Sequence, residues 1–216
     1  MRTFSLATYR SQWPRVGAVA AMAIGGATTV FAKRMSKPQL FSALNFGALL
    51  VHQYEEYVDP GWFPGQFNQG LAKSSQPRNY PLNQDTALVV NAAFGYPFYL
   101  APVVFPKTKW LGLAPALFGI AQVLGHGVVF PRRAGDRYSP GFLASFFLHV
   151  PLGISYIRAL SDNAPLSRSD YAKGALYAIA FAAIGVAGPN LVGRDKDNPH
   201  VFTEAQMGPH GATDGA

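Results

Sequence analysis

Long apolar segments alternate with short polar ones along the chain, and this pattern predicts its architecture. Six apolar segments lie at about residues 16–32, 39–57, 85–105, 110–130, 141–160 and 171–190. Each has the roughly 17–25 residues that a helix needs to cross a hydrocarbon core about 30 Å thick. We therefore expect an all-α fold, a polytopic membrane helix bundle of about six transmembrane helices.

The polar stretches divide the chain into three parts. A basic N-terminal segment covers residues 1–15, the membrane helix bundle covers residues 16–190, and a polar, Gly-rich tail covers residues 191–216. We expect the tail to be disordered, because it has few apolar residues to bury. The first apolar segment ends at Lys33-Arg34, which favours an uncleaved membrane helix over a signal peptide.

Residues 58–84 form a polar stretch of unusual composition within the bundle. The stretch is rich in Pro, Gly, Asn and aromatic residues, which predicts an interfacial loop. Aromatic side chains concentrate at the headgroup level of bilayers. We therefore expect Trp62, Phe63 and Phe67 to enter the headgroup region.

Charge and cysteine content narrow the class of protein. Charged residues make up 13% of the chain, about half the usual fraction for a soluble domain. The net charge of +7 does not indicate nucleic-acid binding, because Lys and Arg flank the apolar segments as membrane anchors do. Their slight excess on the side of the N-terminus predicts a cytoplasmic N-terminus in the cell membrane. The absence of cysteine excludes disulfides, thiolate metal sites and a cysteine nucleophile.

The second apolar segment ends in an unusual cluster of ionisable residues, His52-Gln53-Tyr54-Glu55-Glu56. On a helix, steps of three and four residues place His52, Glu55 and Glu56 on one face. Burying these groups in a membrane is costly unless a counter-charge, a metal, a proton or water satisfies them. The motif is therefore the first candidate for a functional site.

Alternating spans bring further polar residues to the end of the bundle that holds this motif. Counting along the helices places Asn91, His126, His149 and the segment that starts at Tyr138 at a similar depth. The predicted ligands of a Zn, Fe or Mn ion are His52, Glu55, Glu56 and His126. A Glu left unligated can act as a general base, and Asn91 and His149 are secondary candidates.

Structural interpretations compete with this one. The two Glu residues can instead pair with Arg132, Arg133 or Arg137 of the neighbouring loop as a clamp, and His126 can be a packed, hydrogen-bonded histidine. Tyr138-Ser139-Pro140-Gly141 can start a helix, because Pro suits the first helical position. Its functional interpretation is that Tyr138 donates a hydrogen bond to a Glu or to a ligand.

Three elements occur in a defined order: His52-Gln53-Tyr54-Glu55-Glu56, then His126, then Tyr138-Ser139-Pro140-Gly141. In this order the sequence resembles the HXXEE family of multi-span membrane proteins, which is marked by that motif, a further histidine and a Y-x-P-G element. The resemblance covers about residues 40–160. It implies functional positions at His52, Glu55, Glu56, His126 and Tyr138, of which Glu55, Glu56 and Tyr138 are the catalytic candidates. It implies no particular reaction.

The leading functional hypothesis is a metal-dependent membrane enzyme, a hydrolase or isomerase, that acts near one membrane face. Its partners would be membrane lipid and a lipid-like or other apolar small-molecule substrate. One alternative is a proton- or cation-coupled transporter, although the far halves of the helices lack the ionisable residues that would continue a path. The other is a non-catalytic membrane structural or assembly protein whose acidic residues pair with arginines.

Overall fold

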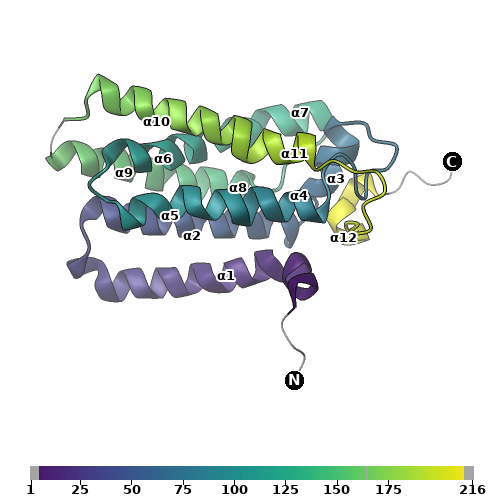
Figure 1. The fold of residues 1–216 in the computed structure, drawn as a ribbon, viewed down its shortest axis with the longest axis horizontal. Helices are drawn as coiled ribbons and strands as arrows, with labels where there is room; N and C mark the ends of the chain where they lie inside the picture. Colours follow the sequence, from purple (N-terminus) through teal and green to yellow (C-terminus); the bar gives the residue numbers. More distant parts are fainter. Residues whose placement is uncertain (1–4, 164, 212–216) are drawn as a thin grey trace.

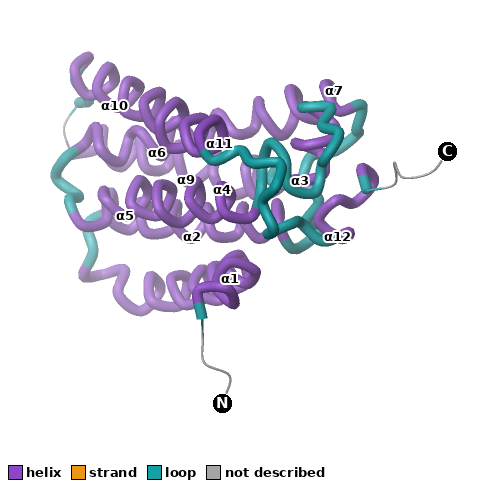
Figure 2. The backbone as a smooth tube through the Cα atoms, turned by 45° about the vertical axis from the view of Figure 1, so that its right-hand side comes forward, coloured by secondary structure: helices purple, strands orange, loops and turns teal. Residues whose placement is uncertain are grey.

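The computed structural model describes residues 5–163 and 165–211, and the prediction of an all-α helix bundle is confirmed (Figure 1). The structure is 77% helical, and the described residues contain no strand. The long helices lie side by side and alternate in direction, with short connections at one end and the longer segment between α2 and α4 at the other (Figures 1 and 2). Residues 58–84 and the C-terminal tail lie at the same end of the bundle.

The bundle is built from six long helical stretches, four of which contain π-helical turns. These stretches are α1 (Leu6–Phe31), α2 (Lys37–Tyr57), α4 (Gln84–Leu88) with Val89–Gly95 and α5 (Tyr96–Val104), α6 (Lys109–Leu124) with Gly125–Val129 and α7 (Phe130–Ala134), α8 (Phe142–Ala144) with Ser145–His149 and α9 (Val150–Asn163), and α10 (Arg168–Ala180) with Phe181–Ala187 and α11 (Gly188–Val192). The short elements are the 3-10 turns Ala32–Arg34 and Gly208–His210, α3 (Phe63–Gly65) with the π-helical Gln66–Leu71, and α12 (Glu204–Met207).

Five of the six stretches are long and apolar enough to cross a membrane: Ala7–Arg34, Gln84–Val104, Lys109–Ala134, Phe142–Asp162 and Arg168–Val192. Their outer faces carry exposed apolar side chains such as Met22, Leu176 and Ile184, as lipid-facing helices do. The chain is therefore a membrane protein. The sixth stretch, α2, is less apolar because it carries the buried polar residues, and it packs against α1, α5 and α9.

A proline follows each of the four π-helical segments within the long stretches. Pro97, Pro131, Pro151 and Pro189 each lie two residues after such a segment. A proline ring clashes with the carbonyl four residues earlier, and here that carbonyl lies inside the widened turns, which relieve the clash. Three of these segments contain polar residues that the sequence singled out, namely Asn91, His126 and His149.

Aromatic packing holds the helices together around α2 and α6. The rings of Phe98 and Phe181 stack with centroids 3.9 Å apart, and this pair packs with Leu49 of α2. A second cluster joins Leu113 of α6 to Tyr156 of α9. Both clusters lie on the elements that carry the polar residues of the site, so they hold those elements at fixed distances.

The C-terminal tail differs from the expectation of disorder as far as the structure describes it. Phe202 and Met207 are each 1% exposed and join a cluster with Trp13 and Tyr57. The tail also packs closely on α3, since a Cβ atom on Gly65 would lie 2.1 Å from the carbonyl oxygen of Met207. These apolar contacts hold the tail against the bundle together with hydrogen bonds, such as those that Asn79 Nδ2 donates to the Lys196 and Asn198 carbonyls.

The loop at residues 58–84 turns back over the end of the bundle. Phe63, which we expected in the headgroup region, is buried, with its ring 5.2 Å from that of His126 and 5.6 Å from that of Phe130. Asn68 is fully buried and binds both the backbone nitrogen and the carbonyl of Leu82, which ties the loop to itself. This loop therefore forms part of the wall of the candidate site.

Candidate metal centre

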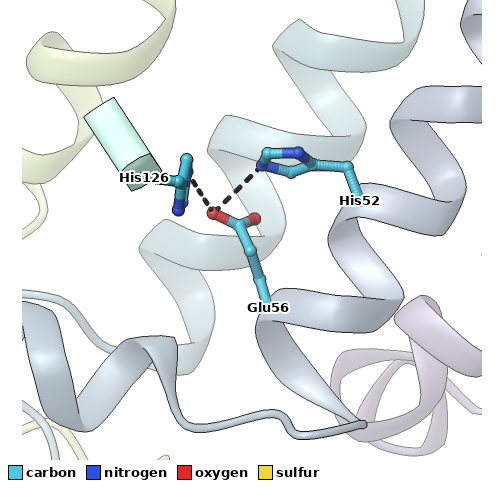
Figure 3. A group of neighbouring side chains, drawn as sticks. All are labelled: His52, Glu56 and His126. Carbon is cyan, nitrogen blue, oxygen red and sulfur yellow. Dashed lines mark ion pairs between the residues drawn. The ribbon is translucent and has the colours of Figure 1, made fainter. Parts of the chain in front are cut away.

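His52, Glu56 and His126 meet in the interior of the bundle (Figure 3). The Glu56 Oε1 atom lies 3.4 Å from His52 Nε2 and 3.5 Å from His126 Nε2, and one ligand atom from each residue lies within 4.8 Å of the others. His52 and Glu56 are one turn apart on α2, whereas His126 lies on the π-helical turn between α6 and α7. All three side chains are buried.

A chain of hydrogen bonds determines which nitrogen of His126 carries a proton. Both amide hydrogens of Gln66 are used, because its Nε2 donates to Asp136 Oδ2 at 2.7 Å and to the Tyr138 carbonyl at 3.0 Å. Gln66 Oε1 then accepts the only hydroxyl proton of Ser139 at 2.5 Å. Ser139 Oγ, 3.1 Å from His126 Nδ1, must therefore accept from that nitrogen, which leaves a lone pair on His126 Nε2.

His52 is oriented in the same way by a different serine. The Ser145 hydroxyl donates to the Gly141 carbonyl at 2.6 Å, so its oxygen is available to accept from His52 Nδ1 at 3.2 Å. The lone pair of His52 then lies on Nε2, the atom that faces Glu56. This Nε2 atom is buried and makes no hydrogen bond among the residues that the structure describes.

Three electron-pair donors thus face one another in a buried space: two imidazole Nε2 atoms and the Glu56 carboxylate. Such an arrangement is unfavourable unless a cation lies between them. Neutral imidazoles held through Nδ1 by a hydrogen-bond acceptor are the usual state of histidine ligands to a metal. The residues present therefore fit a single divalent metal ion, which they could hold through His52, Glu56 and His126.

Glu55 lies apart from this group, although we predicted it as a metal ligand. The Tyr138 hydroxyl and the backbone nitrogen of Leu143, at 3.0 Å, donate to Glu55 Oε1, and the nitrogen of Ala144 donates to Oε2 at 2.7 Å. Glu55 thereby receives the free N–H groups at the start of α8, a favourable position for a carboxylate. The prediction of Glu55 as a ligand is corrected on this ground, because three donors already engage it.

Tyr138 is the hydrogen-bond donor to Glu55 that the functional interpretation of the Y-x-P-G element predicted. Burial raises the pKa of the Tyr138 phenol above its ordinary value, and the hydrogen bond and the charge of Glu55 raise this pKa further. Tyr138 is therefore protonated at neutral pH and binds Glu55 as a neutral donor.

Gly141, the last residue of the same element, lies against both histidine rings. A Cβ atom on Gly141 would lie 2.7 Å from Cε1 of His126 and 3.0 Å from Cε1 of His52. Its φ angle of +101° is also in the region that favours glycine. The Y-x-P-G element therefore does more than start a helix. Its glycine lets the backbone lie against the two histidine rings, where a side chain would not fit.

The secondary candidates lie beside the group of three residues. His149 Nδ1 is 2.8 Å from Asn45 Oδ1, and the His149 ring centroid is 5.6 Å from that of His52. Asn91 accepts from Gln53 Nε2 at 3.1 Å and donates to the Ala87 carbonyl at 2.9 Å. Neither residue belongs to the group of possible ligands among the described residues.

The arginine clamp is not formed in the part of the chain that the structure describes. Arg132, Arg133 and Arg137 have exposed side chains, and the ion pairs of Glu56 come from His52 and His126 instead. Three residues of the site were missed from the sequence: Gln66, Ser139 and Ser145. Ser139 lies inside the Y-x-P-G element and Ser145 one turn after it, whereas no local pattern marks Gln66.

Comparison with known proteins agrees with this geometry. The profile of a family described as "Protein of unknown function with HXXEE motif" matches residues 43–156, more than half of the chain. The matched range includes His52, Glu56 and His126, and also Tyr138 and Gly141. No curated protein and no solved structure matches the chain.

Proposed function

Because the chain belongs to the HXXEE family, whose motif supplies His52 and Glu56 of this site, we propose that it is a membrane metalloenzyme that acts on an apolar substrate. His52, Glu56 and His126 would hold one Zn, Fe or Mn ion. The observation that carries the proposal is the convergence of two Nε2 lone pairs and a carboxylate in a buried space.

The donor set suits a metal that keeps a position for a substrate. Two imidazoles and one carboxylate are a common ligand set of catalytic zinc and of non-haem iron sites, both of which leave coordination positions open. A metal ion held there would supply Lewis acidity toward a polar group of the substrate. Hydrolysis or isomerisation remains the proposed reaction class. Either reaction can use a single metal ion and needs no histidine ligands beyond the two in this group.

The protein residues would hold and orient the reacting groups. Ser139 and Ser145 fix the imidazole rings through Nδ1, and the packed loop at residues 58–84 covers the site from the end of the bundle. Glu55 and Tyr138 we assign to positioning of α8, because their hydrogen bonds to each other and to the helix start occupy them. Apolar surroundings would exclude bulk water from the site.

Metal analysis of detergent-purified protein tests this proposal. The protein should be purified through a tag without histidine, and should contain about one metal ion per chain. His52→Ala and Glu56→Gln should each lose the metal, whereas His200→Ala, which removes a histidine outside the group, should keep it. Loss of metal from all three variants alike, or its absence from the wild type, would overturn the proposal.

We also propose that the N-terminus is cytoplasmic, in the cell membrane, on the strength of the slight excess of Lys and Arg on that side. The site end of the bundle would then lie near the cytoplasmic face. Because the natural chain has no cysteine, one cysteine can be introduced at Ser74 in the loop or at Ser36 at the opposite end. A membrane-impermeant thiol reagent added outside whole cells should label the cysteine at position 36 and not that at 74, and the reverse would contradict this orientation.

A further inference from the structure

A cavity of about 150 Å³ adjoins the group of three possible ligands. Its wall includes His52, Glu56 and His126 on one side. The rest of its wall comes from other residues of α2, the loop at residues 58–84, α5, α6, α7, the π-helical segments that contain Asn91 and Phe181, and Asn190 of α11. A ligand in this cavity would therefore lie next to the candidate metal centre.

The cavity has a mainly apolar surface with several aromatic rings, and it has the size of a small ring compound. Phe63, Phe118, Phe130 and Phe181 contribute apolar surface to its wall. An apolar cavity of about 150 Å³ can hold a molecule of the size of benzene. Size and lining thus favour a small apolar ligand, or one small apolar end of a larger one, over a charged metabolite.

Two wall residues carry a buried polar atom without a hydrogen-bond partner among the described residues, His52 Nε2 at the candidate metal centre and Asn190 Oδ1 away from the group of three possible ligands. Asn190 Nδ2 donates to the Val186 carbonyl at 2.9 Å. The oxygen of the same amide group, Oδ1, takes no part in that hydrogen bond. This Oδ1 atom is buried and accepts no hydrogen bond from the described residues. A buried acceptor without a donor is costly, and in a ligand cavity a bound ligand can supply the missing donor.

We propose that this cavity binds a small apolar molecule that carries one hydrogen-bond donor, such as a hydroxyl group, and that Asn190 Oδ1 accepts from that donor. This proposal adds a substrate class to the proposed function, and it rests on the proposed function for the reaction that the substrate would undergo. Binding in the cavity does not require the metal, because Asn190 and the aromatic wall belong to the protein itself.

Two fluorinated probes of nearly equal size test the proposal. 4-Fluorophenol has a hydroxyl group where 4-fluorotoluene has a methyl group, and the fluorine signal of each can be followed by NMR in detergent-purified protein. The ratio of the affinity for 4-fluorophenol to the affinity for 4-fluorotoluene should be about fivefold to tenfold higher in the wild type than in Asn190→Leu, as expected for one buried hydrogen bond. The comparison between the two proteins cancels the difference in hydration between the probes, and an equal ratio in both proteins would overturn the proposal.

Two variants locate the preference. Asn190→Leu should remove the preference for 4-fluorophenol while leaving the affinity for 4-fluorotoluene within about twofold. Val90→Phe, which fills part of the cavity wall, should weaken binding of both probes. Unchanged binding to Val90→Phe would mean that the probes lie in the detergent or elsewhere on the protein, which would contradict the proposed location.

A metal-free variant separates this proposal from the proposed function. Glu56→Gln, which should lose the metal, should keep the preference for 4-fluorophenol. If the preference disappears with the metal, the hydroxyl is recognised by the metal and the assignment to Asn190 is wrong, while the metal site stands. If the wild type holds no metal but retains a preference that depends on Asn190, the cavity proposal stands and the proposed function fails.

Discussion

Ser145 Oγ lies 3.2 Å from His52 Nδ1, and it must accept a proton from this nitrogen because its own proton goes to the Gly141 carbonyl. The relationship sets the His52 lone pair on Nε2, facing Glu56. Ser139 likewise accepts a proton from His126 Nδ1, because its own proton goes to Gln66. Two serines, one in the loop before α8 and one just after α8, therefore orient both histidines.

Ser145→Ala should weaken metal binding about 10- to 100-fold, because loss of a hydrogen bond that orients a ligand has effects of this size. The variant should still fold, since a small side chain is replaced by a smaller one. Ser42→Ala on α2 is the matched control, because Ser42 Oγ is buried and has no hydrogen-bond partner in the described chain. Metal titration of both apo-proteins checks the prediction, and equal affinities would contradict it.

Gly141→Ala should lower both thermal stability and metal content. A side chain at a φ of +101° is strained, and its Cβ would crowd both imidazole rings, so we expect a loss of about 1–3 kcal/mol or more. Gly26→Ala should be tolerated, because nothing lies within 4 Å of its Cβ position. Thermal unfolding in detergent and metal analysis of the two variants measure the difference, and similar behaviour of both would refute the prediction.

Tyr138 should titrate above the ordinary tyrosine value of about 10. Its neutral form is favoured in the folded state, so the stability from its bond to Glu55 is complete below that value and is lost as pH rises through the raised pKa. The difference in tyrosinate absorbance between wild type and Tyr138→Phe during an alkaline titration reports this group. A Tyr138 that ionises at or below its ordinary pKa would contradict the described hydrogen bond.

Gly65→Ala should release the C-terminal tail from α3. The added Cβ would lie 2.1 Å from the Met207 carbonyl oxygen, a backbone atom that cannot rotate away. Limited proteolysis should then cut the tail beyond residue 193 faster than in the wild type, whereas Gly25→Ala, with open space around it, should leave cleavage unchanged. Equal cleavage of the wild type and Gly65→Ala would show that the tail does not depend on this contact.

The position of the site could be predicted from the sequence, because it depends on helix periodicity and on the alternation of spans. The four-residue step of the motif placed His52 and Glu56 on one face, and span counting brought His126 to the same end. Glu55 could not be assigned in this way. Its role depends on where the start of α8 lies in space, which no local pattern records.

Other features of the fold depend on long-range contacts and were therefore missed. Phe63 and Phe202 are apolar residues in polar segments. They are buried by contacts with residues far away in the sequence, such as His126 for Phe63 and Trp13 for the cluster of Phe202, so their burial cannot be predicted from the local pattern. The widened helical turns had a local sign in the prolines that follow them, such as Pro131 after His126. That sign alone does not predict a widened turn, because Pro14, Pro102 and Pro115 lie inside α-helices without one.

X-ray absorption spectroscopy of the metal-loaded protein tests the central claim most directly. If the metal is bound by His52, Glu56 and His126, the spectrum should contain two imidazole ligands, with nitrogen at about 2.0–2.1 Å for zinc, and at least one oxygen ligand. His126→Ala, if it retains any metal, should lose one imidazole from the spectrum. A metal environment without imidazole, or one that is the same in wild type and His126→Ala, would contradict the account.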